Sequence, residues 1–149
     1  MDPKQNLING VLLIKSNIIN NSKGDIYHIL KNVDLGFVGF GEVYISTIFK
    51  NEIKAWKKHL KMTCNLLVPF GEVKFVLIDK RDNSITYNMV NEFLISPENY
   101  FRLVIPAGVW FGFTGLSDDN FIVNVSDIVH DPLEQINVSR LESNLIYNW

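Results

Sequence analysis

Residues 94–117 have the sequence LISPENYFRLVIPAGVWFGFTGLS, and this stretch decides the predicted fold. The apolar run 101–105 predicts a β-strand that ends at Pro106, because proline has no N–H group to donate to a neighbouring strand. A turn is predicted at 107–108, where glycine allows a sharp change of direction, and a second strand over 109–113. The chain is therefore expected to build strands joined by tight turns.

Turn residues predict two further local structures. Ser96 is typical of a helix N-cap and Pro97 of a first helical position, so one helical turn is expected over 96–99. Two apolar runs, 65–69 and 72–79, are separated by a short glycine-containing turn. They are predicted to form a hairpin-like pair of strands.

The pattern of turn and strand residues in this stretch resembles the LSxEN…IPxGxxxGFxxLS segment of the dTDP-4-dehydrorhamnose 3,5-epimerase family. These are cupin-type β-barrels that act on nucleotide-linked 4-keto-6-deoxysugars. The resemblance extends over about residues 22–135 and implies an all-β, cupin-type (jelly-roll) antiparallel β-barrel with short helical turns. The positions in register are Ser96, Glu98, Asn99, Ile105, Pro106, Gly108, Gly112, Phe113, Leu116 and Ser117.

Composition and charge predict one domain over 1–149. The chain has 149 residues, of which 47% are hydrophobic, and no linker or repeat divides it. A formal net charge of −2 gives no reason to expect a nucleic acid or an anionic membrane as partner. No secretion signal or membrane-spanning run is visible, and a single cysteine, Cys64, excludes an intramolecular disulfide, so a cytoplasmic location is expected. Cys64 lies in an apolar run and is expected to be a buried, inert thiol.

The segment 53–62, IKAWKKHLKM, carries most of the predicted chemistry. It resembles the family's RGLHxQ strand, whose arginine contacts phosphate and whose histidine is the general base. In an ungapped alignment Lys54 takes the arginine position and Lys57 the histidine position. His59 falls two residues later, on the same face of a strand, where the related sugar 3,4-ketoisomerases have a second histidine.

Two interpretations of His59 remain open. Either His59 has taken over as the base, or the pocket has lost its base and only binds. A histidine can act as a base because its reference pKa of about 6.5 is near neutral, and neighbouring lysines would help to keep the ring uncharged. Lys57 could instead stabilise an enolate or hold a phosphate oxygen. With Lys54, Lys58 and Lys61 it forms a basic cluster that suits a small anionic ligand.

No metal or other cofactor is predicted. Metal-binding cupins use an HxH pair, and Lys57 stands in the first of these positions. Its ammonium group would repel a cation, and the other histidines have no ligand spacing.

A row of polar residues is predicted on one face of a strand within 39–48. Because side chains alternate along a strand, Glu42, Tyr44 and Ser46 share a face. The resemblance implies that this face lines the sugar pocket. A polar row that faces solvent is the alternative.

The last predicted core strand and its exit, 121–132, supply further candidates. Asn124 occupies the place of the family's acidic tyrosine, and its amide can hydrogen-bond a substrate but cannot supply an acidic proton. His130, near the family's second tyrosine, could donate a proton or could simply help to close the barrel mouth. Trp110 begins an aromatic run that could stack on a base or sugar, although barrel core is the alternative.

Two other segments have structural predictions. Asp79 and Arg81 are expected to shape a turn rather than touch substrate. The tail, 133–149, has no clear counterpart of the family's aspartate that orients the base, and the loss of this group would weaken a histidine-based mechanism. The aromatic end of the tail is expected to pack on the barrel or on a partner subunit.

The function predicted on this basis is epimerisation or keto-isomerisation of a nucleotide-diphospho-4-keto-6-deoxysugar in surface polysaccharide biosynthesis. The base, His59, would remove the proton alpha to the ketone, and His130 or Tyr44 would be the acid. The resemblance also implies a homodimer. The alternative is a catalytically inactive sugar-nucleotide-binding or structural cupin. It is favoured by the substitutions Lys57, Phe75, Phe111 and Asn124.

Overall fold

The computed structural model describes residues 6–142 and 144–149, which form strands, turns and one short helical turn. The elements in chain order are β1 (Leu12–Lys15), β2 (Ile18–Ile19), β3 (Ile26–Tyr27), β4 (Glu42–Phe49), β5 (Ile53–His59), β6 (Cys64–Phe70), β7 (Val73–Ile78), β8 (Val90–Ile95), β9 (Phe101–Ile105), β10 (Trp110–Gly115), β11 (Asp119–Ser126), η1 (Pro132–Glu134) and β12 (Gln135–Asn137).

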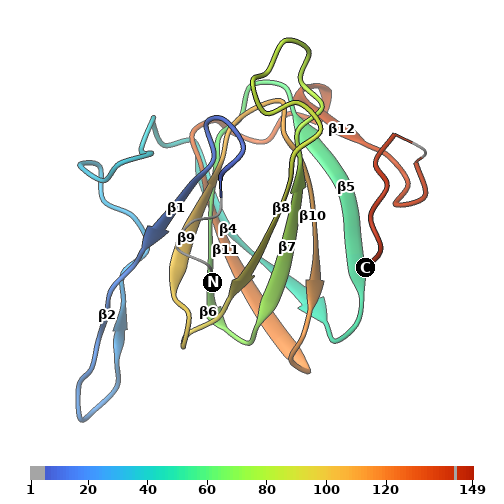
Figure 1. The fold of residues 1–149 in the computed structure, drawn as a ribbon. Coiled ribbons are helices and arrows are strands. Elements are labelled where there is room, and N and C mark those ends of the chain that lie inside the picture. The colour runs from blue at the N-terminus through green and yellow to red at the C-terminus, as the bar shows by residue number, and fades with distance from the viewer. Residues whose placement is uncertain (1–5, 143) are drawn as a thin grey trace.

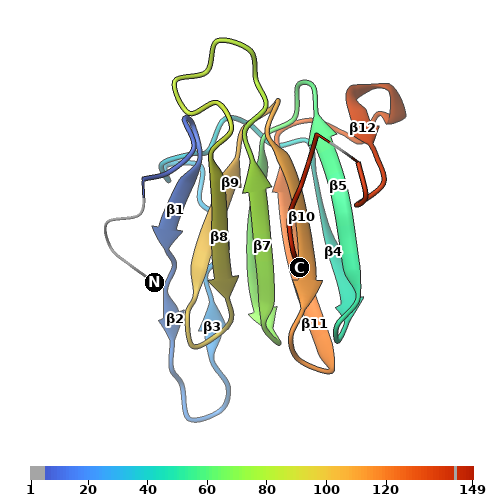
Figure 2. The ribbon, with the colours of Figure 1, turned by 45° about the vertical axis from the view of Figure 1, so that its right-hand side comes forward.

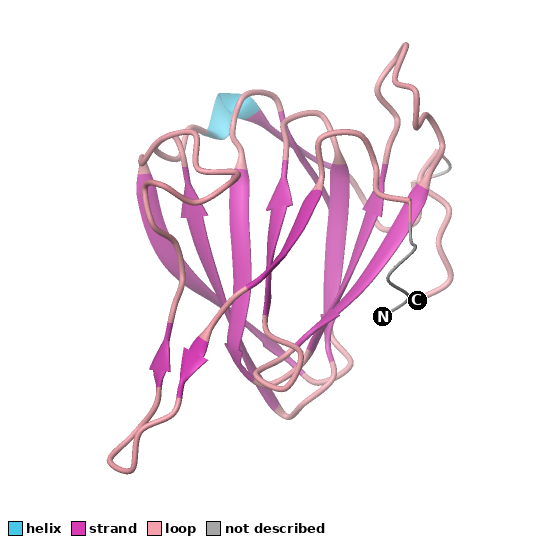
Figure 3. Cartoon of the chain, turned by 60° about the vertical axis from the view of Figure 1, so that its left-hand side comes forward, coloured by secondary structure: helices cyan, strands magenta, loops and turns pink. Residues whose placement is uncertain are grey.

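Two five-stranded antiparallel sheets face each other and enclose the core (Figures 1 and 2). One sheet has the order β1-β9-β6-β11-β4 and the other the order β12-β5-β10-β7-β8. The short β2 and β3 form a separate hairpin that projects away from the body of the barrel (Figure 3). The predicted all-β jelly-roll fold is confirmed.

The decisive stretch forms two strands in different sheets. The strand β9 has the bounds that the sequence predicts and ends before Pro106. The turn that follows contains Gly108 with a φ of 87°, a backbone conformation that glycine adopts without strain. The next strand, β10, begins one residue later than predicted and continues to Gly115. Because β9 pairs with β1 and β6 while β10 pairs with β5 and β7, this turn carries the chain from one sheet to the other.

The predicted helical turn at 96–99 is wrong. These residues form a tight turn between β8 and β9, closed by two backbone hydrogen bonds between Ser96 and Asn99, of 3.1 and 3.3 Å. The hydroxyl of Ser96 accepts a hydrogen bond from the Asn99 N–H at 3.2 Å, so the capping residue acts as expected although no helix follows. The strand β9 begins two residues after Asn99, which leaves no room for a helix.

The predicted pairing of β6 with β7 is also wrong. The chain does turn at Gly71, where φ is 81° and a Cβ atom would come within 2.4 Å of the Asp119 carbonyl oxygen. The two strands then diverge, because β6 pairs with β9 and β11, and β7 pairs with β8 and β10.

Buried apolar side chains form two clusters on opposite faces of the β12-β5-β10-β7-β8 sheet. The larger cluster fills the space between the sheets, with Phe75 and Leu77 pointing inward from β7. Since residues alternate along a strand, Val76 and Ile78 point to the outer face. There they meet the C-terminal tail, which crosses this sheet in Figure 2. The second cluster, here called the outer cluster, consists of Trp56, Val76, Ile78, Trp110 and Leu145, with Val138, Tyr147 and Trp149 packed against it.

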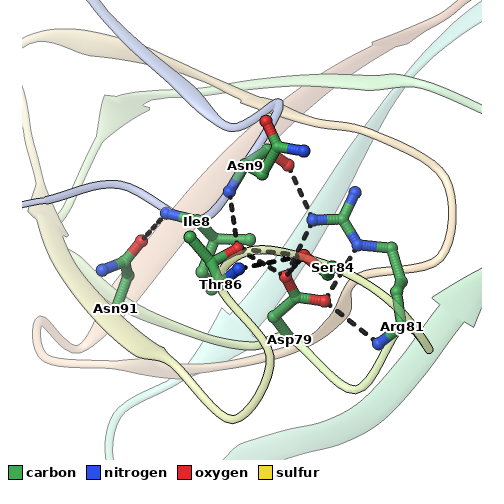
Figure 4. Close-up of polar contacts among 7 residues, drawn as sticks. All are labelled: Ile8, Asn9, Asp79, Arg81, Ser84, Thr86 and Asn91. Carbon is green, nitrogen blue, oxygen red and sulfur yellow. Dashed lines mark hydrogen bonds and ion pairs between the residues drawn. The ribbon is translucent and has the colours of Figure 1, made fainter.

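A buried carboxylate organises the loop after β7 (Figure 4). Asp79 is fully buried and accepts hydrogen bonds from Arg81 Nε at 2.9 Å and from the hydroxyls of Ser84 and Thr86, each at 2.6 Å. Arg81 and Thr86 also bind the backbone of Asn9, at 2.7 and 2.9 Å, which ties the N-terminal segment to this loop. The prediction that Asp79 and Arg81 shape a turn is confirmed. Among the described residues, no helix is long and apolar enough to cross a membrane.

Candidate active site

A cavity of about 390 Å³ lies between the two sheets, beside β4, β5, β10 and β11. It is here called the main cavity. Its walls are formed by Tyr44, Ser46, Lys54, Ala55, Trp56, Lys57, Leu66, Phe111, Phe113, Ile122, Asn124, Asn137 and Val138.

One wall is polar and comes from the pair of strands β4 and β11. Tyr44 lies opposite Asn124 in this pairing, and Ser46 lies opposite Ile122. All four residues line the main cavity. Glu42 shares their face of β4 but lies at the first position of the strand, outside the cavity walls.

Tyr44 and Asn124 are joined in a way that leaves each with a free polar atom. The Asn124 Nδ2 group donates a hydrogen bond to the Tyr44 hydroxyl oxygen at 2.9 Å and lies 3.7 Å from the Cys64 sulfur. Since the tyrosine oxygen accepts this bond, its own proton remains available to a ligand. The Asn124 Oδ1 atom is buried and has no hydrogen-bond partner among the described residues, so it can accept a hydrogen bond.

The opposite wall carries positive charge from β5. Lys57 is half-buried and lines the main cavity, as does the more exposed Lys54, whose amine donates a hydrogen bond to the Thr47 carbonyl at 2.7 Å. Lys61 is exposed in the turn after β5 and does not line the cavity. Two of the three predicted lysines are therefore placed where an anionic ligand in the cavity would meet them.

His59 is buried at the end of β5, behind the cavity wall formed by Phe111. The two rings stack with centroids 6.0 Å apart and planes at 24°. The Nδ1 atom of His59 bonds to Oε1 of Glu134, and Oε2 accepts hydrogen bonds from the backbone N–H groups of Lys61 and Met62 at 3.2 and 3.1 Å. This carboxylate fixes the ring orientation and leaves Nε2 as the nitrogen that can take a proton.

The local sequence explains why Glu134 reaches His59. The carboxylate of Asp131 caps the η1 turn by accepting the Leu133 N–H at 2.9 Å, and Pro132 begins the turn. The strand β12 follows at once and pairs with β5, with Gln135 opposite His59. The carboxylate therefore arrives beside the ring. We expected no counterpart of an orienting carboxylate in the tail, and this expectation is wrong. No local sequence pattern links Glu134 to His59, because the two residues meet only through the pairing of β12 with β5.

Opposing influences set the proton affinities of the His59–Glu134 pair. Burial lowers the pKa of His59, and the charges of Lys57 and His130 lower it further, while the bond to Glu134 raises it. Burial alone would raise the pKa of Glu134, but hydrogen bonds from His59 and from the Met62 and Lys61 backbone bring it below its usual value. A histidine with a lowered pKa is uncharged near neutral pH and can accept a proton.

Tyr44 and Cys64 are held in their protonated forms. Burial raises the pKa of Tyr44, so its hydroxyl keeps its proton at neutral pH. Burial also raises the pKa of Cys64 to about 12, and its side chain is 1% exposed. Cys64 is thus a buried thiol, as the sequence predicted.

Besides Glu42, Lys61 and His59, two further predicted site residues lie outside the walls of the main cavity. His130 is exposed in the segment between β11 and η1 and is absent from the cavity walls. Trp110 points to the outer cluster, where the Lys58 amine lies 4.7 Å from its ring centre. Phe111 and Phe113, which follow on the inner face of β10, supply the aromatic wall instead. No group of three or more His, Cys, Asp or Glu side chains in the described part of the chain could hold a metal ion.

Two facing antiparallel sheets, with a cavity of mixed apolar and polar lining between them and a carboxylate-bound histidine beside it, define a cupin-type β-barrel with a small-molecule site. The sequence model of the dTDP-4-dehydrorhamnose 3,5-epimerase family matches residues 5–149. The chain belongs to this family.

Individual proteins agree with this assignment. The chain is 31% identical to the dTDP sugar isomerase from Desulfovibrio desulfuricans G20, with a TM-score of 0.92 over 95% of this chain and 92% of that one. It is 24% identical to the spore coat polysaccharide biosynthesis protein SpsL of Bacillus subtilis over 96% of this chain and 97% of that protein. It is 29% identical to the probable low-salt glycan biosynthesis epimerase Agl13 of Haloferax volcanii over 98 residues, a match that spans only 62% of either protein.

Proposed function

We propose that this chain is an epimerase or keto-isomerase of a nucleotide-diphospho-4-keto-6-deoxysugar, acting in the biosynthesis of a surface polysaccharide. Membership of the epimerase family supports the reaction class. Relatives named for glycan and spore coat polysaccharide biosynthesis support the pathway. The main cavity, with a polar wall facing a basic one, suits a sugar that carries phosphate groups.

The observation that carries this proposal is the buried pair of His59 and Glu134. A carboxylate held by two backbone N–H groups keeps Nδ1 of the ring occupied. A histidine oriented in this way is the usual arrangement of a general base, because its second nitrogen stays unprotonated and fixed in direction. A barrel that only binds sugar would have no need of such a pair.

In the proposed reaction, His59 Nε2 takes the proton from the carbon next to the ketone. The electrons of the broken C–H bond form a double bond to the carbonyl carbon, and the carbonyl oxygen becomes an enolate oxygen. The Lys57 ammonium group and the Tyr44 hydroxyl stabilise this negative charge. In an epimerisation, a proton returns to the same carbon from the opposite face. In a keto-isomerisation, the enolate oxygen takes up a proton, the hydroxyl on the neighbouring carbon gives up its proton to become the new ketone, and a proton is delivered to the former carbonyl carbon. Tyr44 is the proposed acid because it lines the main cavity. His59 and His130 both lie outside the cavity walls, but His59 is buried and stacks on the wall residue Phe111, whereas His130 is exposed.

We also propose a cytoplasmic homodimer. The outward face of the edge strand β4 exposes Val43, Ile45 and Phe49 at 54, 62 and 67%. Such a row of apolar side chains on an unpaired edge favours contact with another protein surface. The buried free thiol of Cys64 suits a reducing compartment. Light scattering of the purified protein would determine the oligomeric state.

Solvent exchange tests the proposed chemistry. We would follow dTDP-4-keto-6-deoxyglucose by proton NMR in D2O and watch for deuterium at C3 and C5. With the wild-type protein we expect exchange, and with His59→Ala we expect none. Tyr44→Phe should slow turnover, whereas the matched histidine variant His130→Ala should behave like the wild type.

Other outcomes would change the proposal in defined ways. Exchange that survives in His59→Ala would show that another group is the base. Loss of turnover in His130→Ala with little change in Tyr44→Phe would show that His130, and not Tyr44, is the acid. If the wild type gave no exchange but saturation-transfer signals showed the nucleotide bound, the chain would be a binding protein.

A further inference from the structure

A second cavity, of about 110 Å³, lies where the β2–β3 hairpin joins the barrel. It shares no residue with the main cavity. One side is formed by β1 and β9, where Ile14 pairs with Arg102, and the other by the segment that follows the hairpin. The proposed reaction gives this cavity no role.

Arg102 is an unusual residue to find in the wall of this cavity. Its side chain is only 2% exposed. Its guanidinium group donates to the Asn65 side-chain oxygen and, at 2.8 Å, to the Leu35 carbonyl oxygen. Both of these partners are neutral, and the ion pairs found in the described residues do not include Arg102. The negative charge of Asp34 acts on Arg102, but no hydrogen bond or ion pair between the two side chains is found in the described residues. A buried positive charge is costly when no carboxylate is bonded to it, and an arginine has further N–H groups to donate.

The other charged groups around the second cavity make it positive. Lys15, Lys31 and Arg102 line it, and Asp34 is the only acidic wall residue in the part of the chain that the structure describes. The Asp34 carboxylate accepts a hydrogen bond from the backbone N–H of Lys31 at 2.8 Å, so part of its capacity to accept hydrogen bonds is already used. His28 adds a ring that can donate a hydrogen bond.

We propose that the second cavity binds a small oxyanion of the size of phosphate, held by Arg102 inside and by Lys15 and Lys31 at the rim. Guanidinium groups bind such anions through paired, charge-assisted hydrogen bonds. A water molecule takes about 30 Å³ of liquid, so the cavity has room for one tetrahedral oxyanion and little more. The anion would join the segment after the hairpin to β1 and β9, and so would hold the base of the hairpin against the barrel.

Calorimetric titration of the full chain with inorganic phosphate at low ionic strength tests the proposal. We expect saturable binding to the wild type. Lys15→Ala and Lys31→Ala should each weaken it by about tenfold, the usual effect of losing one charge-assisted contact, and Arg102→Gln by more. Lys50→Ala is the matched control, because this exposed lysine pairs with Asp118 outside both cavities, and it should bind phosphate like the wild type.

The design separates this site from the main cavity. If phosphate binding fell in Lys57→Ala and stayed unchanged in Lys15→Ala, the anion would occupy the main cavity and the proposal would be wrong. Absence of saturable binding, or equal binding by all variants, would also overturn it. If Arg102→Gln failed to fold, the double variant Lys15→Ala, Lys31→Ala would decide, since both side chains are exposed. The exchange assay is a separate measurement, so either proposal can fail alone.

Discussion

At the scale of single residues, the proton affinity of His59 depends on its bond to Glu134. Burial and the nearby charge of Lys57 favour the neutral ring, and the carboxylate favours the charged one. Burial and Lys57 thus leave the free ring uncharged and able to take a proton, while Glu134 stabilises the imidazolium that then forms.

We therefore expect Glu134→Gln to lower the exchange rate by about 100-fold, within the usual range for losing acid–base catalysis. The same change should move the acid limb of the pH profile to lower pH, because the carboxylate that raises the pKa of His59 is gone. Initial rates across the pH range would measure both effects. The exposed Glu98→Gln is the control. An acid limb that stayed in place would show that His59 is not the titrating base.

The sequence predicted some of these residues and not others, for a physical reason. The shared face of Tyr44 and Ser46 follows from alternation within one strand. Glu134 was missed because it lies 75 positions from His59 and meets it through the pairing of β12 with β5, which leaves no local pattern. Trp110 was predicted to line the pocket but faces the outer cluster. A shift of one residue along a strand moves every side chain to the other face of the sheet, and the turn before the strand determines this register.

At the scale of elements, the loop after β7 depends on the carboxylate of Asp79. Its hydrogen bonds to Arg81, Ser84 and Thr86 more than offset the effect of burial, and they hold the pKa of Asp79 well below its ordinary value. The charged form is therefore favoured in the folded state. Its contribution to stability is complete above the ordinary pKa of about 3.9 and is lost as the pH falls below that value.

We expect Asp79→Asn to lower the free energy of unfolding by about 3 kcal/mol near neutral pH, because it removes the buried negative charge that pairs with the partly buried Arg81. Urea unfolding at about pH 7 and about pH 3 should show the difference from wild type shrinking at the lower pH. Asp82→Asn, exposed in the same loop, should change little at either pH. A difference that did not depend on pH would argue against an ionised Asp79.

Element bounds were predictable where one residue type forces them. Pro106 ends β9 at the expected residue because its nitrogen carries no hydrogen. The residues around Ser96 gave a wrong prediction because the same capping preference serves a tight turn between two strands. The partners of β6 and β7 could not be predicted locally, since each pairs with strands distant in the sequence.

At the scale of the whole molecule, the barrel has apolar side chains on both faces of one sheet. The family pattern predicted the closed barrel, whereas the docking of the tail on this outer face required the three-dimensional structure. Leu145 is 2% exposed there and packs with Val76 and Ile78. The tail is therefore part of the stability of the fold rather than an appendage.

We expect Leu145→Ala to cost about 2–5 kcal/mol of unfolding free energy, the usual range for removing a buried leucine side chain. The control, Leu141→Ala, removes a side chain that is 83% exposed and should cost less than about 0.5 kcal/mol. Chemical denaturation of the two variants would measure both. Equal losses would show that the tail does not contribute through its packing.

The outer cluster has a spectroscopic consequence. The chain contains three tryptophans, and all of them, Trp56, Trp110 and Trp149, belong to this one cluster. The intrinsic fluorescence of the protein therefore reports on the contact between tail and sheet. Release of the tail would shift the emission to longer wavelength while the circular dichroism of the β-strands stayed unchanged, so the two signals together distinguish undocking of the tail from unfolding of the barrel.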